Sequence, residues 1–329
     1  KMNKEKMLIT GGTGSLGQNL AEHFIEKYVI TVFSRDEDKQ ARMMQEFPSI
    51  NYVLGDVRDS DSCYSVINDQ DIVIHAAALK QVPTAEFNPF EAVKTNIHGA
   101  QNVIEAALEN DVKKVVALST DKACNPINLY GATKLASDKM FAAANHWQGS
   151  HHTTFAVVRY GNVVGSRGSV VPFFLKKKEE GVLPITDERM TRFWITLDQS
   201  VKFVLDSLKR MKGGELFVPK IPSVKVTQLG RVIAPECDQQ IIGIRPGEKL
   251  HETMVTEDDA RLTIEYPLPD CDTHIRSHYP ICGKLILIRI SVSTHISEHT
   301  DCTLCNTLAD DASHRVQHTL RCCCEVVVG

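Results

Sequence analysis

Met7-Leu-Ile-Thr-Gly-Gly-Thr-Gly-Ser-Leu-Gly17 is the stretch that decides the fold of this 329-residue chain. The apolar run Met7–Thr10 is typical of a buried strand, and residues 19–27 have the apolar spacing of a helix. A glycine-rich segment, Gly11–Gly17, therefore lies between a strand and a helix. Glycine lets the backbone approach a pyrophosphate, and a helix N-terminus favours the negative charge of that group. The stretch predicts a dinucleotide-binding strand–loop–helix unit.

Further apolar runs alternate with helical patterns through the first 160 residues. Helices are expected at residues 41–47, at 89–110 and from Leu129 onward. The expected strands are Val29–Phe33, Asn51–Leu54, Asp71–His75, Lys114–Leu118 and Thr154–Arg159. Strands that alternate with helices at this interval predict an α/β fold with a doubly wound, Rossmann-like parallel sheet and right-handed crossovers.

The regular alternation ends after Tyr160, where glycines and prolines become frequent. A helix at 197–211, a strand at 215–218 and a segment at 241–252 are the expected features beyond this point. We predict a cofactor-binding Rossmann domain over residues 1–160. We predict a smaller C-terminal substrate lobe over residues 161–270, with segments that return to the Rossmann domain.

The overall charge and hydropathy narrow the possible partners. A net charge of −4 gives no basic surface for nucleic acid, so no nucleic-acid partner is expected. No apolar run approaches the ~20 residues that cross a bilayer, and the charged N-terminus lacks the apolar region of a signal peptide. We therefore expect a cytoplasmic protein with no membrane partner.

Residues 271–329 form a tail of different composition. It holds seven of the ten cysteines and six of the thirteen histidines. Cys302-x-x-Cys305 precedes His314-x-x-x-His318, but the eight residues between the two pairs fall short of the ~12–15 that are usual in zinc fingers. We predict no metal site, and no disulfides in a cytoplasmic protein. A frameshifted or otherwise non-native tail is the interpretation we favour.

The end of the second expected strand bears on the choice of cofactor. NAD enzymes commonly place Asp or Glu there, for the ribose 2′-hydroxyl. This chain has Ser34 and Arg35, with Lys39 one turn further on. Two cations suit a 2′-phosphate, so we predict NADP; the alternative is that both are solvated surface charges. The residues expected at the cofactor are Gly11, Thr13, Gly14, Ser15, Leu16, Gly17, Ser34, Arg35, Lys39, Asp56, Val57, Ala76, Ala77, Ala78, Tyr130 and Lys134. Asp56 and Val57 are expected to meet the adenine, and Ala76–Ala78 to give the cofactor close access beside the fourth strand.

The chemistry is carried by a second stretch, Ser119-Thr-Asp-Lys-Ala-Cys-Asn-Pro-Ile-Asn-Leu-Tyr-Gly-Ala-Thr-Lys134. Its first residues end a strand, where open α/β sheets bind ligands. Tyr130 and Lys134 lie one helical turn apart on one face. A phenol has a pKa near ~10, but a nearby ammonium and a positive nicotinamide both favour phenolate. Tyr130 is therefore predicted to take a hydroxyl proton as a hydride leaves.

These motifs resemble those of the extended short-chain dehydrogenase/reductase family. The second stretch is similar to that of the inverting UDP-N-acetylglucosamine 4,6-dehydratases, which start pseudaminic acid synthesis for flagellin glycosylation. The resemblance covers about residues 3–265. The supporting segments are Ser34–Asp36, Ala78–Pro83, Arg192–Thr196, Gly214–Lys220 and Ile244–Glu252.

The resemblance implies a lyase with tightly bound NADP that acts on UDP-N-acetylglucosamine and inverts C5. Its product would be a UDP-2-acetamido-2,6-dideoxy-4-hexulose, and the protein would be a homo-oligomer, a dimer or a hexamer. The family would also continue with an aromatic, proline-bearing C-terminal segment, which nothing in residues 271–329 resembles.

The same resemblance assigns roles to individual residues. Thr120, Asp121, Lys122, Tyr130 and Lys134 would be catalytic. Asp121 and Lys122 would remove water across C5–C6, with Asp121 as the acid and Lys122 as the base by hypothesis. The expected substrate-binding residues are Lys80, Asn162, Arg192, Arg245 and Glu248, with Arg167 as a looser candidate. Asn96 is expected to shape its helix or a water relay rather than to contact the substrate.

Two alternatives stay open. The first is a C4 or C5 epimerase of the same sugar nucleotide, and the second is a non-catalytic NADP-binding regulatory protein. Simple dehydrogenases and epimerases of this superfamily need only the hydroxyl, Tyr and Lys. The extra pair Asp121 and Lys122 therefore favours the dehydratase, and the intact Tyr130 and Lys134 argue against a regulator.

Overall fold

The computed structural model describes residues 4–147, 149–166, 168–261, 263–266, 274–275, 277–279 and 283–285. The chain forms two compact units. Unit 1 holds the described residues of Lys1–Arg159, Val201–Pro219 and Thr253–Arg289. Unit 2 holds Tyr160–Ser200 and Lys220–Glu252, apart from residue 167.

A seven-stranded sheet forms the centre of unit 1. Its strand order is β10-β6-β5-β4-β1-β2-β3, and every neighbouring pair is parallel. Its strands are β1 (Lys6–Thr10), β2 (Val29–Ser34), β3 (Asn51–Leu54), β4 (Ile72–His75), β5 (Lys114–Leu118), β6 (Thr154–Val158) and β10 (Glu215–Phe217). This confirms the predicted doubly wound α/β fold. The order reverses beside β1, between β2 and β4, which makes the switch point of the sheet the place for a ligand.

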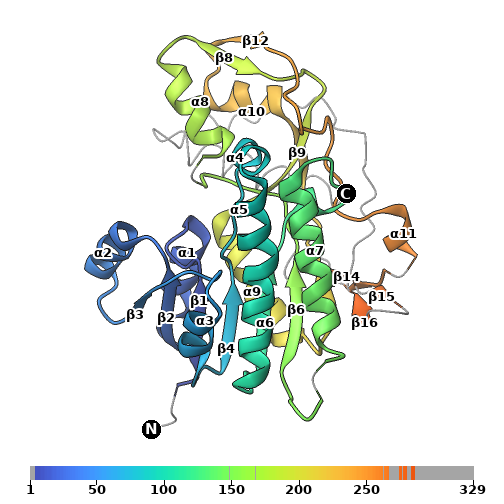
Figure 1. Cartoon of the computed structure of the whole chain (residues 1–329). Coiled ribbons are helices and arrows are strands. Elements are labelled where there is room, and N and C mark those ends of the chain that lie inside the picture. The colour runs from blue at the N-terminus through green and yellow to red at the C-terminus, as the bar shows by residue number, and fades with distance from the viewer. Residues whose placement is uncertain are drawn as a thin grey trace. The chain divides into compact units, whose positions relative to one another are not determined.

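Helices connect these strands and cover the sheet. In Figure 1, α6 and α7 lie in front of the sheet and α9 lies behind it. Helix α6 packs against both α3 and α7. The helices of this unit are α1 (Ser15–Phe24), α2 (Glu37–Glu46), α3 (Ser60–Ile67), α4 (Val82–Phe87), α5 (Pro89–Val93), α6 (Gly99–Glu109), α7 (Leu129–Ala144), most of α9 (Leu197–Arg210) and α11 (Glu257–Ala260).

The expected long helix over residues 89–110 is interrupted. A π-helical turn, η1 (Lys94–His98), separates α5 from α6. The wide turn carries Asn96, whose buried side chain accepts from the Leu79 N–H at 2.8 Å and donates to the Leu79 carbonyl at 3.0 Å. π-Turns are rare and are frequent at functional sites. The helical spacing of apolar residues over 89–110 gave no sign of this turn, so it was not predicted.

The core of unit 1 explains why its strands form. Strands β1, β4, β5 and β6 are buried along almost their whole length and are rich in Val, Ile and Leu. Strands covered on both faces by helices read as continuous apolar runs of this kind. Strand β3, at the edge of the sheet, is the exposed exception.

Unit 2 is built from small sheets and two helices. A three-stranded sheet has the order β11-β9-β7, and β12 pairs with β8. Its core includes Phe174, Leu183, Trp194 and Leu229. The elements are β7 (Asn162–Val163), α8 (Val170–Lys178), β8 (Val182–Ile185), β9 (Thr191–Ile195), β11 (Ser223–Lys225), α10 (Val226–Ile233) and β12 (Asp238–Ile241).

Four short strands follow in the last described segments: β13 (Glu265–Tyr266), β14 (His274–Ile275), β15 (Ser277–Tyr279) and β16 (Gly283–Leu285). The Cys302–Cys305 and His314–His318 pairs lie outside the described residues. Within the part of the chain that is described, no group of three His, Cys, Asp or Glu side chains could hold a metal ion. None of the helices in that part has the length and apolar character that crossing a bilayer requires.

Candidate active site

The glycine loop after β1 has the geometry that a pyrophosphate requires. Gly11 has a φ of 66°, and a Cβ on it would lie 2.8 Å from the Cα of Ala77. A Cβ on Gly17 would lie 2.5 Å from the Cα of Gly12. Helix α1 begins after Gly14 with no side-chain cap and no acidic residue in its first turn. The glycines let the phosphate approach the backbone, and the helix N-terminus has no capping side chain or first-turn carboxylate that would compete for its N–H groups. This arrangement fits a dinucleotide phosphate.

The end of β4 is tied to the end of β1 by hydrogen bonds. The hydroxyl of Thr10 accepts from the Ala77 N–H at 3.3 Å and lies 2.9 Å from Nδ1 of His75. The Ala76 N–H donates to the Thr10 carbonyl at 3.1 Å. These bonds hold Ala76 and Ala77 beside the glycine loop, and the predicted access for a cofactor at Ala76–Ala78 stays a prediction.

Ser34 and the two cations predicted for the 2′-phosphate, Arg35 and Lys39, are arranged around the start of α2. Ser34 is buried and its hydroxyl accepts from Gln40. The side chain of Arg35 is 58% exposed, and its Nη1 lies 3.5 Å from a carboxylate oxygen of Asp56. Lys39 forms an ion pair with the helix-capping Asp36. Both cations are exposed to solvent at the carboxyl end of β2, and Arg35 is the more exposed of the two.

Asp56, predicted to lie at the adenine, is held by two arginines. Arg58 donates to its carboxylate at 2.7 and 2.9 Å, and Arg35 lies farther away. Burial raises the pKa of Asp56, but the hydrogen bonds and charges of these arginines outweigh burial and lower it. The neighbouring Val57 is buried, and a Cβ on Gly99 would lie 2.8 Å from its Cγ2. The adenine contact itself stays a prediction.

The residues after β5 form a single 3₁₀ turn, η2 (Asp121–Ala123), which we call the catalytic turn. Asp121 is fully buried, and its Oδ1 accepts from the Thr120 hydroxyl and from Nζ of Lys122, both at 3.0 Å. Its Oδ2 is buried without a hydrogen-bond partner among the described residues. One oxygen of the carboxyl group is thus held by two hydrogen bonds.

Helix α7 begins after Asn128, whose side chain accepts from the Gly131 N–H at 2.8 Å. Both Tyr130 and Lys134 are buried on it. Burial raises the pKa of Tyr130; a hydrogen bond with the Thr120 hydroxyl lowers it, and the charges of nearby carboxylates raise it. Burial also lowers the pKa of Lys134, against the opposing charge of Asp138. The structure therefore brings the predicted hydroxyl, phenol and amine together in unit 1.

Asp138 is a buried group that the sequence interpretation missed. Its Oδ2 accepts from the Ser119 hydroxyl at 2.7 Å and from Nη2 of Arg159 at 3.1 Å. Both Asp138 and Arg159 are almost fully buried. Asp138 lies one turn beyond Lys134, so Tyr130, Lys134 and Asp138 share one face by their spacing of four residues. That spacing was the available signal.

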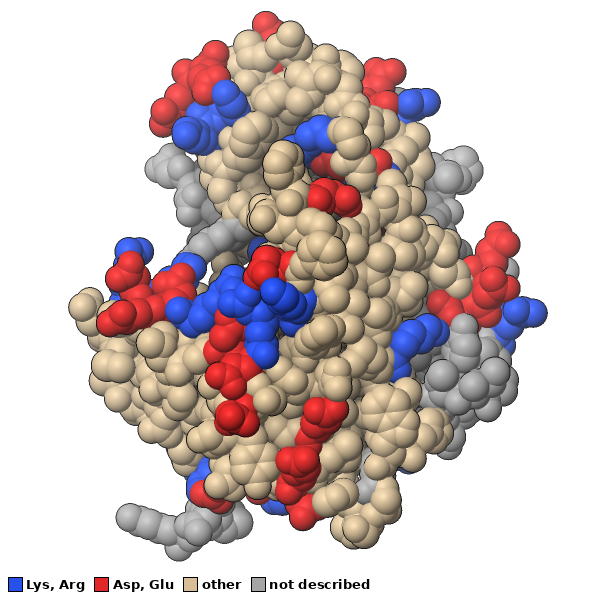
Figure 2. Space-filling model, in the orientation of Figure 1, with Lys and Arg blue, Asp and Glu red and all other residues tan. Residues whose placement is uncertain are grey.

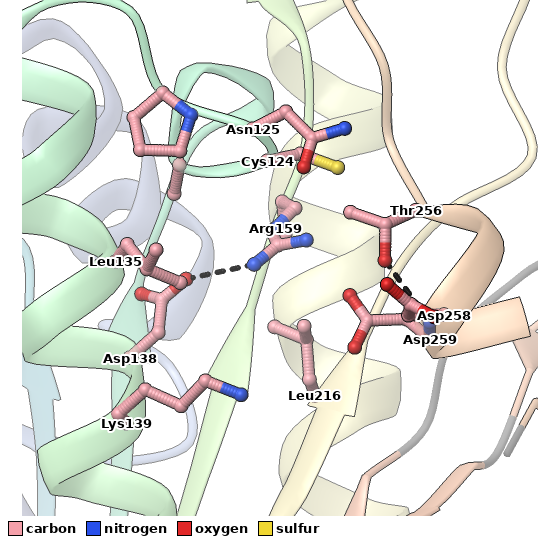
Figure 3. Close-up of a pocket in the computed structure, with 12 residues that line it drawn as sticks. Cys124, Asn125, Leu135, Asp138, Lys139, Arg159, Leu216, Thr256, Asp258 and Asp259 are labelled. Atoms are coloured by element: carbon pink, nitrogen blue, oxygen red, sulfur yellow. Dashed lines mark hydrogen bonds and ion pairs between the residues drawn. The ribbon is translucent and has the colours of Figure 1, made fainter.

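A pocket of about 210 Å³ lies beside this ion pair. Figure 3 shows Arg159 reaching across it towards Asp138, with Thr256 and Asp259 on the far side. Its wall includes residues 123–126, the first of which, Ala123, ends the catalytic turn, and Leu135 and Lys139 of α7. The pocket therefore borders the end of the catalytic turn and one face of α7, and we call it the pocket behind the catalytic turn.

The predicted substrate residues are spread over both units. Lys80, in unit 1, is exposed and follows Leu79, whose backbone Asn96 holds. Asn96 also donates to the hydroxyl of Thr133 on α7, so it ties η1 both to α7 and to the segment after β4.

In unit 2, Arg192 is buried and donates to the carbonyls of Thr191 and Leu250 at 2.8 and 3.2 Å. Arg245 is exposed and pairs with Glu248, and Asn162 begins β7. Arg167 lies outside the described residues. The substrate roles of these residues stay predictions.

Comparison with known proteins places this site in a family. A family model described as polysaccharide biosynthesis protein matches residues 7–269. The chain belongs to this family. It is 60% identical over 271 residues to an inverting UDP-N-acetylglucosamine 4,6-dehydratase of Campylobacter jejuni, with 80% of this chain and 81% of that protein covered. It is 41% identical to a UDP-glucose 4-epimerase of Rickettsia canadensis, with 77% and 78% covered.

Two solved structures extend the comparison. The X-ray structure of Pen from Bacillus thuringiensis is 39% identical, covers 84% of this chain and 88% of that one, and has a TM-score of 0.78. DesIV, a dTDP-glucose 4,6-dehydratase from Streptomyces venezuelae with NAD and TYD bound, is 20% identical with a TM-score of 0.68 over 78% of this chain and 91% of that one. The similarity to DesIV shows that the two chains share the Rossmann fold.

Proposed function

We propose that this chain is an inverting UDP-N-acetylglucosamine 4,6-dehydratase. The observation that carries the proposal is the pair Asp121 and Lys122 on the catalytic turn, joined by a 3.0 Å hydrogen bond in the unit that holds Tyr130 and Lys134. The 60% identity to an inverting dehydratase of Campylobacter jejuni supports it. The pseudaminic acid pathway, and a dimeric or hexameric state, stay predictions of the resemblance.

The cofactor of the proposal is NADP. The glycine loop, the uncapped start of α1 and Ala76–Ala78 would hold the dinucleotide, and exposed Arg35 would bind the 2′-phosphate. When bound, NADP⁺ would accept hydride from C4 of the sugar and return it to C6, and its positive ring would favour a phenolate. NAD in the DesIV structure supports a nicotinamide dinucleotide in this fold, and Arg35 supports the phosphorylated form.

Tyr130 would take the proton of the C4 hydroxyl. Burial and nearby carboxylates hold the pKa of this phenol above its usual value, so the phenolate needs positive charge close by. Lys134, four residues on along the same helix face, would supply it, and the Thr120 hydroxyl would hydrogen-bond the phenolate oxygen.

Asp121 and Lys122 would remove water once C4 is a ketone. Dehydration needs one acid and one base, and a single proton moved along their hydrogen bond turns a carboxylate–ammonium pair into a carboxylic acid and a free amine. Lys122 would then take the C5 proton, while Asp121 would protonate the C6 hydroxyl, which leaves as water. The pair returns to carboxylate and ammonium, so its charge balances over the step. The proton that passes along this hydrogen bond arrives on Oδ1 of Asp121, so Oδ1 would carry the acidic proton.

The diphosphate and sugar would be bound by Lys80 of unit 1 and by Asn162, Arg192 and Arg245 of unit 2. Of the two arginines, Arg245 suits a phosphate better, because its guanidinium is exposed and Arg192 is committed to backbone carbonyls. Glu248 would orient Arg245 through their ion pair.

Incubation of the NADP-loaded protein with UDP-N-acetylglucosamine in D₂O tests the function. We expect a 6-deoxy-4-keto product with deuterium at C5, identified by NMR. Asp121→Asn should lower the rate of water loss by at least ~100-fold, since acid catalysis contributes on the order of 10²–10⁴. The exposed Asp61→Asn on α3 is the matched control and should react as the wild type does.

An epimerase is the second candidate, favoured by the 41% identity to a Rickettsia UDP-glucose 4-epimerase. Epimerisation leaves the C6 hydroxymethyl group unchanged. An epimer with that group intact would reject the dehydratase and support this candidate. An Asp121→Asn variant that eliminates water at the wild-type rate would leave the function standing but reject the acid role of Asp121.

A further inference from the structure

Gly131, the residue after Tyr130, is in contact with the backbone of the catalytic turn. A Cβ on Gly131 would lie 2.2 Å from the carbonyl oxygen of Lys122, 3.0 Å from its carbonyl carbon and 3.1 Å from Cβ of Pro126. Carbon and oxygen atoms that are not bonded stay more than ~3 Å apart, so the smallest side chain would force a shift of about 1 Å. The obstacle is backbone, which cannot turn away as a long side chain can.

The contact arises from the face of α7 on which Gly131 lies. Leu135 follows four residues later on the same face and lines the pocket behind the catalytic turn. Residues 123–126 form another part of the pocket wall, as Figure 3 shows for Cys124 and Asn125. A turn that borders about 210 Å³ of open space has room to move. The strain of a larger residue 131 can therefore be relieved by displacing the turn while helix α7 stays in place.

We propose that Gly131 is a positioning residue for dehydration: its missing side chain lets the catalytic turn approach α7, so that Asp121 and Lys122 meet the same sugar as Tyr130. The inference rests on the proposed function. Tyr130 and Lys134 are held by α7 itself, whereas Asp121 and Lys122 are held by the turn. Moving the turn should therefore impair water loss far more than the first proton and hydride transfer.

Gly131→Ala in the NADP-loaded chain tests this separation. Mixing with UDP-N-acetylglucosamine should form NADPH, read at 340 nm, within about threefold of the wild-type rate. Water loss, read by NMR, should fall about 100-fold, the cost of a misplacement of about 1 Å. NADPH should then accumulate in the variant. A crystal structure of Gly131→Ala without substrate gives an independent measurement, in which the Lys122 carbonyl oxygen should move by about 1 Å.

Gly230→Ala is the matched control. Gly230 also lies within a helix, α10, but its Cβ would meet the flexible end of the Gln239 side chain at 2.9 Å. It should leave both rates unchanged, and both variants should melt within a few degrees of the wild type.

A double variant separates positioning from a general structural effect. If Gly131 acts through the turn, adding Gly131→Ala to Asp121→Asn should slow water loss by less than threefold more, because the effects of coupled residues do not add. Equal loss of both steps in Gly131→Ala, an unmoved turn, or fully additive effects would each overturn the inference. A wild type that makes no dehydrated product would instead overturn the proposed function.

Discussion

His75 gives a prediction about stability whose size can be worked out. It ends β4, is 1% exposed, and its Nδ1 lies 2.9 Å from the Thr10 hydroxyl. Its ring packs on Phe141 with centroids 5.5 Å apart. The Thr10 hydroxyl has one proton to donate and two lone pairs, one of which accepts from the Ala77 N–H, so it can bond Nδ1 in either tautomer of the neutral ring. Burial and then the charge of Lys134 lower the pKa of His75 to about 3.

The sign of the effect follows from proton binding. The folded pKa lies below the ~6.5 of an unfolded histidine, so between these values the unfolded chain binds a proton that the folded chain excludes. Stability contributed by His75 is therefore complete above pH 6.5 and is lost as pH falls towards 3. At about 1.4 kcal/mol per pKa unit, His75 alone should remove about 2 kcal/mol between pH 8 and pH 5.

Urea unfolding of the wild type and of His75→Asn at pH 8, 7, 6 and 5 measures this. An asparagine oxygen can accept from Thr10 and does not titrate, so the difference in unfolding free energy between the two proteins should shrink by about 2 kcal/mol on acidification. His152→Asn, at an exposed histidine, should run parallel to the wild type. A difference between wild type and His75→Asn that is constant with pH would refute the reasoning.

Three further predictions concern buried and cofactor-facing groups. Asp138→Asn leaves the buried charge of Arg159 unpaired and should lower the unfolding free energy by about 3–5 kcal/mol in urea, whereas Lys139→Gln on the same helix should change it by less than about 1 kcal/mol. Arg35→Ser should weaken NADP⁺ binding at least ~10-fold by calorimetry and leave NAD⁺ binding within about twofold; equal losses for both cofactors would contradict a 2′-phosphate contact. Asn96→Ala leaves both backbone groups of Leu79 without their partner and should lower the unfolding free energy by about 2 kcal/mol or more, and an unchanged urea midpoint would show that water replaces the amide.

Most of unit 1 was predictable because its sequence signals and its structure have the same cause. Buried parallel strands need unbroken apolar runs, and the predicted runs 7–10, 114–118 and 154–159 correspond to β1, β5 and β6. Gly11 and Gly17 are required because a Cβ would clash with Ala77 and with Gly12. The glycine spacing in the sequence therefore predicted the loop. Helices α3 and α4, six to eight residues long, were missed because so short a segment shows little periodicity.

Unit 2 was harder to predict for a physical reason. Its strands are two to five residues long, and β7 pairs with β9 across a separation of about thirty residues. Strands of this length carry too few alternations to distinguish them from loops, and their pairing depends on contacts far away in the sequence. The apolar positions of its core, such as Phe174 and Trp194, were visible only as scattered hydrophobic residues.

The charges around Tyr130 show why spacing alone could not complete the site. The catalytic turn and α7 bring two buried carboxylates close to three cations, and each carboxylate has one cation as its ion-pair partner. Asp121 pairs with Lys122 at 3.0 Å, and Asp138 pairs with Arg159 at 3.1 Å. Lys134 has no ion pair within the described residues, so its positive charge is not neutralised by a single carboxylate.

That imbalance matches what the proposed chemistry needs. A phenolate at Tyr130 requires a cation that is not already committed, and Lys134 is the one that remains. Arg159 holds one oxygen of the neighbouring carboxylate, Oδ2 of Asp138, at 3.1 Å. Its own position at the end of β6 is fixed by the Met254 carbonyl at 3.2 Å, which links the returning segment of unit 1 to the charge at the centre of the site.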